Sequence, residues 1–223
     1  MGFDRGPLKI FSWASSVLLC LVALTIFVVP AFPFQISNVL YSVFFTGIYV
    51  FSALTITRRR RLAVSSALVL IPLIWISHLA GLQWLKIYFR ILQIVCFFWL
   101  VIELIRQVAQ AERVTMMVIV EAIISYLLLG FAFALAVTVL IYFVPAAYTI
   151  ATSVDAEENI HELFREKIYY SFITYSTTGY GDILPVHPIA KSLAILMGVS
   201  GQLFLATIIA MLVGKYSSSQ RTG

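Results

Sequence analysis

Long runs of apolar residues alternate with short polar loops along this chain. A helix of about 20 apolar residues crosses a hydrocarbon core of about 30 Å. The pattern therefore predicts six membrane-spanning helices, at residues 10–29, 37–56, 62–80, 83–105, 115–144 and 189–214. The first run has the alternative of a cleavable signal, because Arg5 and Lys9 precede it, but the run is long and no A-x-A cleavage site closes it.

A shorter pattern lies between the fifth and sixth runs. Asn159, followed three residues later by Glu162, is typical of a helix N-terminus with a capping box, and we expect this helix to run to about Thr174. Such a helix is too short to cross, so it must enter the membrane and return, as protein-buried or water-lining backbone can do. Its C-terminal end would direct a partial negative charge toward a cation.

The composition agrees with this pattern. The 223 residues are 61% hydrophobic and 11% charged, with a mean hydropathy of +1.00, so we expect an all-α membrane protein. The formal charge of +5 does not indicate nucleic acid binding, because the basic residues lie in short loops beside apolar runs. Cys20 and Cys96 lie within apolar runs and form no metal-binding spacing.

Basic residues mark alternate loops and so predict the orientation. They lie before the first run, at residues 58–61, in the loop 106–115 and after the sixth run, which makes both termini cytoplasmic in a multi-pass protein of the cell membrane. The segment between the fifth and sixth runs is then external. Its charged side chains give a net −3: Asp155, Glu157, Glu158, Glu162 and Glu166 against Arg165 and Lys167.

Residues 177–182 read Thr-Thr-Gly-Tyr-Gly-Asp and predict a potassium selectivity filter. Backbone carbonyls directed at one axis replace the hydration shell of K⁺. Gly179 and Gly181 can adopt the positive φ angles that such a backbone needs. We expect Thr177, Thr178, Gly179 and Tyr180 to bind K⁺, Gly181 to complete the filter, and no cofactor to be required.

From about Glu158 to Lys215 the chain resembles the tetrameric potassium channels, whose filters read Thr-Val-Gly-Tyr-Gly followed by Asp. Because one chain carries one filter, the resemblance implies a homotetramer in which four pore loops surround one axis. Thr178 stands where Val or Ile is commoner, and its hydroxyl would need a partner behind the filter.

The resemblance also assigns supporting residues. Tyr169 and Tyr170 would form an aromatic collar that braces Tyr180. Some channels place an acid behind the filter, but Ile173 occupies that position here, so Asp182 would lack this partner.

Gly198 and Gly201 lie in the sixth run, and Gly201 matches the hinge glycine of the family. Two interpretations stay open, a bend in the lining helix and close packing through small residues, Ser200 included.

The resemblance divides the chain into a voltage-sensor-like domain at residues 1–107, a pore domain at 108–215 and a short tail at 216–223. The fourth run carries only Lys86 and Arg90, and the first three runs contain no Asp or Glu. Arg90 lies about 12 Å inside the membrane and about 20 Å from Glu103 along the helix. It is either a structural arginine in a wet crevice or a lone gating charge. We therefore expect weak or absent voltage gating, with a voltage-gated channel as the alternative.

Two further charge assignments concern the cytoplasmic face. The run Arg58, Arg59, Arg60 and Arg61 either sets topology or binds anionic lipid headgroups, at about 1 kcal/mol per basic residue. Glu121 is expected to pair with Arg106 or Arg113, and residues 106–115 would link the peripheral helices to the pore.

Other function classes fit less well. Six spans with Gly198-Val199-Ser200-Gly201 are similar to the rhomboid intramembrane proteases, but no histidine follows Ser200 to pair with it. His161-Glu162 begins an H-E-x-x-H zinc pattern, in which Arg165 occupies the second histidine position. A potassium transporter would carry four filter-like loops, and this chain has one. We do not expect an enzyme.

Overall fold

The computed structural model describes residues 6–56, 59–79, 83–111, 115–150 and 164–221. The chain forms two compact units. The N-terminal unit comprises residues 1–125 with 218–223, and the C-terminal unit comprises residues 126–217. Helix α5 (Met116–Phe143) contributes its first turns to the N-terminal unit and the remainder to the C-terminal unit.

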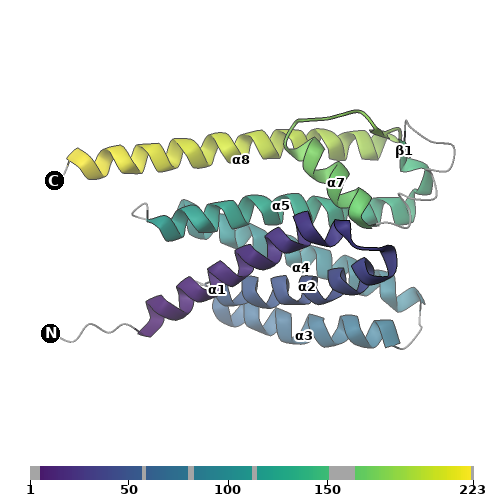
Figure 1. Ribbon diagram of the computed structural model, residues 1–223, viewed down its shortest axis with the longest axis horizontal. Coiled ribbons are helices and arrows are strands. Elements are labelled where there is room, and N and C mark those ends of the chain that lie inside the picture. The colour runs from purple at the N-terminus through teal and green to yellow at the C-terminus, as the bar shows by residue number, and fades with distance from the viewer. Residues whose placement is uncertain (1–5, 57–58, 80–82, 112–114, 151–163, 222–223) are drawn as a thin grey trace. The chain divides into compact units, whose positions relative to one another are not determined.

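The N-terminal unit is built from consecutive helices (Figure 1). A π-helical turn (Leu24–Val28) and a 3-10 turn (Val29–Ala31) extend the first helix, and Pro33, with extended backbone at φ −56° and ψ 150°, then starts the second. The α-helices of this unit are α1 (Gly6–Ala23), α2 (Phe34–Thr55), α3 (Arg60–Leu79, with Pro72 inside it) and α4 (Gln83–Ala109).

Aromatic rings form the core of the N-terminal unit. The Phe97 ring centroid on α4 lies 5.3 Å from that of Phe45 and 6.4 Å from that of Tyr49, both on α2. The Tyr49 hydroxyl donates to Ser66 Oγ on α3 at 3.5 Å. All three rings are buried, and their close packing stabilises the unit through van der Waals contacts.

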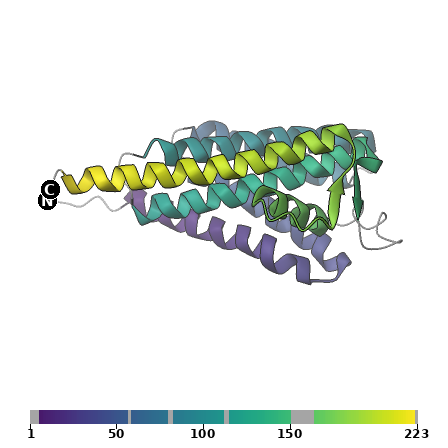
Figure 2. The ribbon, with the colours of Figure 1, turned by 90° about the horizontal axis from the view of Figure 1, so that it is seen from above.

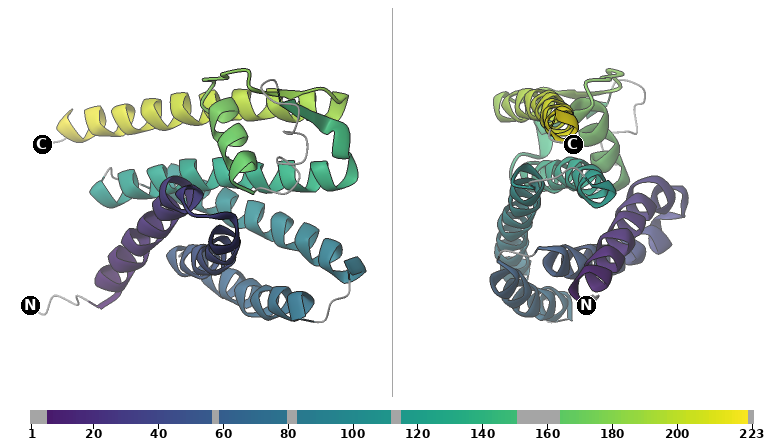
Figure 3. Two further views of the ribbon diagram at one scale, coloured as in Figure 1. Left: turned by 45° about the vertical axis from the view of Figure 1, so that its right-hand side comes forward. Right: turned by 90° about the vertical axis from the view of Figure 1, so that its left-hand side faces the viewer.

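The C-terminal unit places a short helix between two long ones (Figures 1 and 3). After α5, a 3-10 turn (Pro145–Ala147) leads into strand β1 (Tyr148–Ile150). Helix α7 (Phe164–Tyr175), strand β2 (Ile183–Pro185) and helix α8 (Pro188–Arg221) follow, and α8 is the long helix that ends in yellow in Figure 2. Strands β1 and β2 pair antiparallel, with Tyr148 opposite Pro185.

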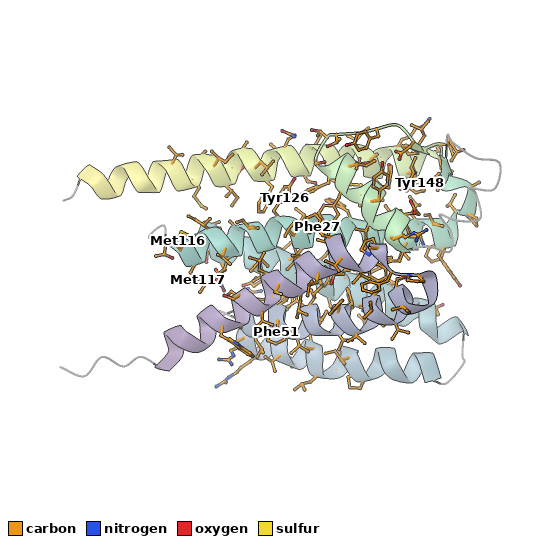
Figure 4. All side chains as sticks on the ribbon, in the orientation of Figure 1. Phe27, Phe51, Met116, Met117, Tyr126 and Tyr148 are labelled. Atoms are coloured by element: carbon orange, nitrogen blue, oxygen red, sulfur yellow. The ribbon has the colours of Figure 1, made fainter. Side chains whose placement is uncertain are left out.

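Tyr175, at the last turn of α7, is the centre of the core of this unit. Its ring centroid lies 4.8 Å from that of Tyr126 and 5.8 Å from that of Phe133, both on α5. Tyr126 in turn contacts Phe204 of α8 at 5.6 Å between centroids, and it is labelled in Figure 4. The ring cluster therefore fixes the C-terminal end of α7 against both long helices.

Helices occur at all six predicted positions. Among the described residues, the helical segments long and apolar enough to cross a membrane are Trp13–Ala31, Ile91–Ala109, Met116–Phe143 and Pro188–Met211, with Val39–Thr55 apolar but shorter. The mostly helical class is confirmed, whereas the six spans stay a prediction. The pairing of β1 with β2 was not predicted.

Candidate functional site: the loop after helix α7

Backbone N–H groups of the 176–182 loop donate hydrogen bonds to the last carbonyls of α7. Ser176 N donates to Phe172 O at 2.9 Å and Thr177 N to Thr174 O at 3.0 Å. Thr178 N and Gly179 N both donate to Ile173 O, at 2.8 and 3.1 Å. The last carbonyls of a helix otherwise lack partners. The loop satisfies them, and its own N–H groups are thereby turned toward α7.

Alternate residues of this loop have left-handed backbone. Thr177, Gly179 and Gly181 have φ angles of 61°, 54° and 80°. Among the described residues, Thr177 is the only non-glycine residue with a positive φ. An alternation of positive and negative φ angles is a pattern in which successive peptide groups can face the same side. A Cβ at Gly179 or Gly181 would meet nothing within 4 Å, so these glycines are required by their dihedral angles and not by space.

Thr177 carries the conformational strain of the loop. A β-branched residue with positive φ is rare, and such strain persists where the surroundings hold it in place. Here two hydrogen bonds hold the side chain: its hydroxyl donates to Ser176 O at 2.6 Å and accepts from Gln202 Nε2 of α8 at 3.1 Å.

The hydroxyl of Thr178 has a partner inside the loop. Its Oγ1 lies 2.9 Å from Oγ of Ser176. These two side chains lie two residues apart, on either side of the left-handed Thr177. Ser176 thus provides the partner that the extra hydroxyl at position 178 needs.

Asp182 at the end of the loop is bonded on both oxygens. The Tyr169 hydroxyl donates to Oδ2 at 2.6 Å, and the backbone N–H of Ile183 donates to Oδ1 at 3.1 Å. Ile173 supplies no acid, as the sequence indicated, but Tyr169 fills the role of partner. The hydrogen bond to the Asp182 carboxylate, with smaller contributions from burial and charge, raises the pKa of Tyr169 to about 12.

The other tyrosine of the predicted collar lies against β1. The ring centroid of Tyr170 is 5.0 Å from that of Tyr148, in an edge-to-face arrangement. Tyr148 is labelled in Figure 4. Burial raises the pKa of Tyr148 well above its usual value. The Tyr180 side chain is 72% exposed, and a collar around it stays a prediction.

The segment after the loop is hydrogen-bonded to the 3-10 turn that follows α5. Val186 N and His187 N donate to Ala147 O at 3.0 and 3.3 Å, next to the β1–β2 ladder. His187 Nδ1 accepts from Ile189 N at 3.3 Å, which satisfies a free N–H at the start of α8. The loop is therefore held at one end by α7 and at the other by a small sheet.

Gly198 and Gly201 of α8 have different surroundings. A Cβ at Gly201 would overlap the backbone carbonyl of Tyr175, whereas a Cβ at Gly198 would make only ordinary contacts, at 3.8 Å to Thr174 O. Close approach of α8 to the end of α7 thus requires Gly201. Ser200 Oγ donates to Met197 O of its own helix at 3.0 Å.

The charged residues of the N-terminal unit pair differently from the prediction. Glu121 was expected to pair with Arg106 or Arg113. Instead Arg106 Nη1 contacts Glu103 Oε2 at 3.4 Å, because Glu103 is one helical turn away, and Arg59 lies 3.8 Å from the other oxygen of Glu103. Arg113 lies outside the described residues.

Glu121 accepts a hydrogen bond from a neutral amide. Gln107 Nε2 of α4 donates to Glu121 Oε2 of α5 at 3.1 Å and to Thr55 O at the end of α2 at 3.3 Å. The Glu121 side chain is buried, with 4% of its surface exposed. We call Thr55, Gln107 and Glu121 the polar joint, because one amide links the ends of three helices.

The other predicted charged residues are exposed, paired or outside the described part of the chain. Arg60 and Arg61 are exposed at the start of α3, and Arg165 pairs with Glu166 at 3.2 Å. The side chains of Lys86 and Arg90, the whole of Arg58, and residues 155–162 with their four acids lie outside the described part. Among the described residues, no three metal-ligating side chains lie together.

Comparison with known proteins supports a channel. A family model described as "Ion channel" matches residues 114–217, which include α5, α7, the 176–182 loop and most of α8. Over 58 residues the chain is 38% identical to "Two-pore potassium channel 4" of Arabidopsis thaliana, an alignment that covers 26% of this chain and 20% of that relative. No solved structure matches the chain significantly. Residues 114–217 are thus similar to an ion channel domain, and the comparisons point to a channel and not to an enzyme.

Proposed function

We propose that the protein is a potassium-selective channel that conducts K⁺ passively through a homotetrameric pore. The observation that carries this proposal is the alternating backbone of Thr177, Gly179 and Gly181. Peptide groups turned to one side are what a ring of carbonyl ligands requires. The N–H groups of residues 176–179 all bond to α7, which supports a loop whose carbonyl oxygens face away from that helix.

The exposure of the loop supports assembly. Residues 176–181 are all exposed in the single chain, and polar backbone exposed between apolar helices cannot face lipid. Within Pro188–Met211 of α8 only 17% of the residues are buried, against 56% of Met116–Phe143 of α5. Other copies of the chain around a rotation axis would cover both the loop and α8, and four is the number that forms a potassium filter.

The potassium selectivity is proposed from two sources together. The loop carries Gly-Tyr-Gly after two threonines, and the similar protein from Arabidopsis thaliana is named as a potassium channel. Because the ligands would be main-chain carbonyls, threonine at position 178 is compatible with the filter, and its hydroxyl is satisfied by Ser176.

In this proposal the protein is multi-pass, with both termini cytoplasmic and the 155–162 acids outside. Arg60 and Arg61, which are exposed, would contact anionic headgroups on the cytoplasmic side. Moving one charge through 100 mV is worth about 2.3 kcal/mol, so one Arg90 in each of four subunits supplies at most about 9 kcal/mol. Voltage dependence should therefore be shallow.

Planar-bilayer recording of the purified protein under a potassium gradient, with sodium on both sides and voltage steps, tests the proposal. The reversal potential should follow the potassium gradient and the conductance should change little with voltage. A reversal potential that follows sodium equally would refute the filter. A steep conductance–voltage curve that flattens with Arg90→Gln would favour the voltage-gated alternative.

A further inference from the structure

A polar side chain of α8 reaches the inner end of the proposed filter. Gln202 follows Gly201, the glycine at which α8 comes close to the carbonyl of Tyr175. That close approach brings the Gln202 amide to 3.1 Å from the Thr177 hydroxyl. Both residues are exposed in the single chain, on the side that assembly would turn toward the axis.

The chemistry of the two groups fixes the direction of this hydrogen bond. The Thr177 hydroxyl lies 2.6 Å from the carbonyl oxygen of Ser176, which can only accept, so the hydroxyl hydrogen is used there. Gln202 must then present its amide N–H to Thr177 and not its carbonyl oxygen. The remaining capacity of the Thr177 oxygen is one lone pair, because the other accepts from Gln202.

This arrangement affects a cation at the inner end of the filter. The N–H dipole of Gln202 has its positive end next to the oxygen that would contact the ion, and rotational symmetry would repeat it around the axis. Such dipoles weaken the binding of a cation at that position, and conduction requires sites that bind weakly enough to release the ion.

We propose that Gln202 is a positioning residue that holds the Thr177 hydroxyl and lowers the affinity of the innermost cation site. The inference rests on the proposed potassium channel. It assigns to one side chain of α8 a role in how readily K⁺ leaves or enters the filter from the cytoplasmic side. Selectivity, which belongs to the carbonyl rings, is a separate property.

Gln202→Met tests the inference, because methionine has the same length as glutamine and lacks the amide. The readout is the internal K⁺ concentration that gives half-maximal outward single-channel conductance. Loss of one hydrogen-bond donor per subunit should lower this concentration about three- to tenfold. Gln202→Asn, which keeps an amide but is one methylene shorter, should shift it in the same direction. Leu203→Met, at the next position of α8, should keep the wild-type value.

Combining Gln202→Met with variants of Thr177 shows whether the change in half-saturating K⁺ concentration depends on the Thr177 hydroxyl. Gln202→Met should have no further effect in Thr177→Val, which lacks the hydroxyl, and its full effect in Thr177→Ser, which keeps it. An unchanged or raised half-saturating concentration in Gln202→Met, or an equal shift in the Thr177→Val background, would overturn the inference. A wild-type protein that fails to select K⁺ would instead overturn the proposed function.

Discussion

The 176–182 loop and the polar joint both place polar groups within an apolar chain, but they satisfy them differently. The loop groups are exposed in the single chain, and Ser176, Thr177 and Thr178 bond to near neighbours. In the joint, the buried Glu121 depends on Gln107, a residue of another helix. The loop thus makes local bonds at an exposed surface, whereas the buried joint satisfies Glu121 Oε2 and leaves Oε1 without a hydrogen-bond partner among the described residues.

The largest effect on potassium selectivity is expected from a substitution that changes the backbone conformation of the 176–182 loop. Gly181→Ala would place an alanine at φ 80°, at a cost of about 1–2 kcal/mol in each subunit. Potassium selectivity or current should be lost. The measurement is the reversal potential in bilayers, with Gly198→Ala as the control, because that glycine has room for a methyl group. A Gly181→Ala channel with wild-type selectivity would show that the alternating backbone does not select the ion.

The second prediction distinguishes a packing role of Gly201 in α8 from a hinge role. Gly201→Ala forces a methyl group against the Tyr175 carbonyl, and overpacking costs about 1–3 kcal/mol. The thermal unfolding temperature should fall for Gly201→Ala and stay near wild type for Gly198→Ala. If both variants keep wild-type stability but change the open probability, the hinge interpretation is right.

The sequence predicted the helices well because each depends on a long local pattern. It also identified the loop, because Gly179 and Gly181 stand two residues apart, and that spacing is a local signal of alternating backbone. The positive φ of Thr177 could not be predicted, since no property of threonine favours it. It depends on bonds from Ser176 and Gln202, the second of which is 25 residues away.

The neutral partner of Glu121 was missed for a similar reason. Charge alone suggested an arginine partner, but Arg106 is one helical turn from Glu103 and pairs there. The actual donor, Gln107, carries no charge and lies on another helix. Sequence reasoning that ranks partners by charge overlooks neutral amides, although these avoid the cost of burying a second charge.

The third prediction concerns the joint itself. Gln107→Leu would leave the buried Glu121 without the amide donor, and an unsatisfied buried group costs about 1–3 kcal/mol. The unfolding temperature should fall while potassium selectivity persists, because the joint is distant in sequence from the loop. Gln107→Leu combined with Glu121→Leu should recover part of the loss, since no carboxylate then remains to be satisfied. Equal stability of wild type and Gln107→Leu would show that the joint is not needed for folding.

The smallest effect is expected at Asp182, where the loop ends near solvent. Tyr169→Phe removes one donor to Oδ2 but leaves the Ile183 N–H on Oδ1. The cost should be at most about 1 kcal/mol, because exposure weakens charge-assisted bonds. Tyr170→Phe is the matched control, since the neighbouring tyrosine packs on Tyr148. The unfolding temperature and the current during long recordings should fall slightly for Tyr169→Phe and less for Tyr170→Phe.

The pH dependence provides an independent check on the same bond. The pKa of Tyr169 is raised to about 12 in the folded protein, so the protonated hydroxyl is favoured by folding. Its stabilisation is complete below the ordinary tyrosine pKa of about 10 and is lost as the pH rises toward 12. The stability difference between wild type and Tyr169→Phe should therefore be constant from neutral pH to about pH 10 and shrink above it. A difference that already shrinks near neutral pH would show that another group carries the interaction with Asp182.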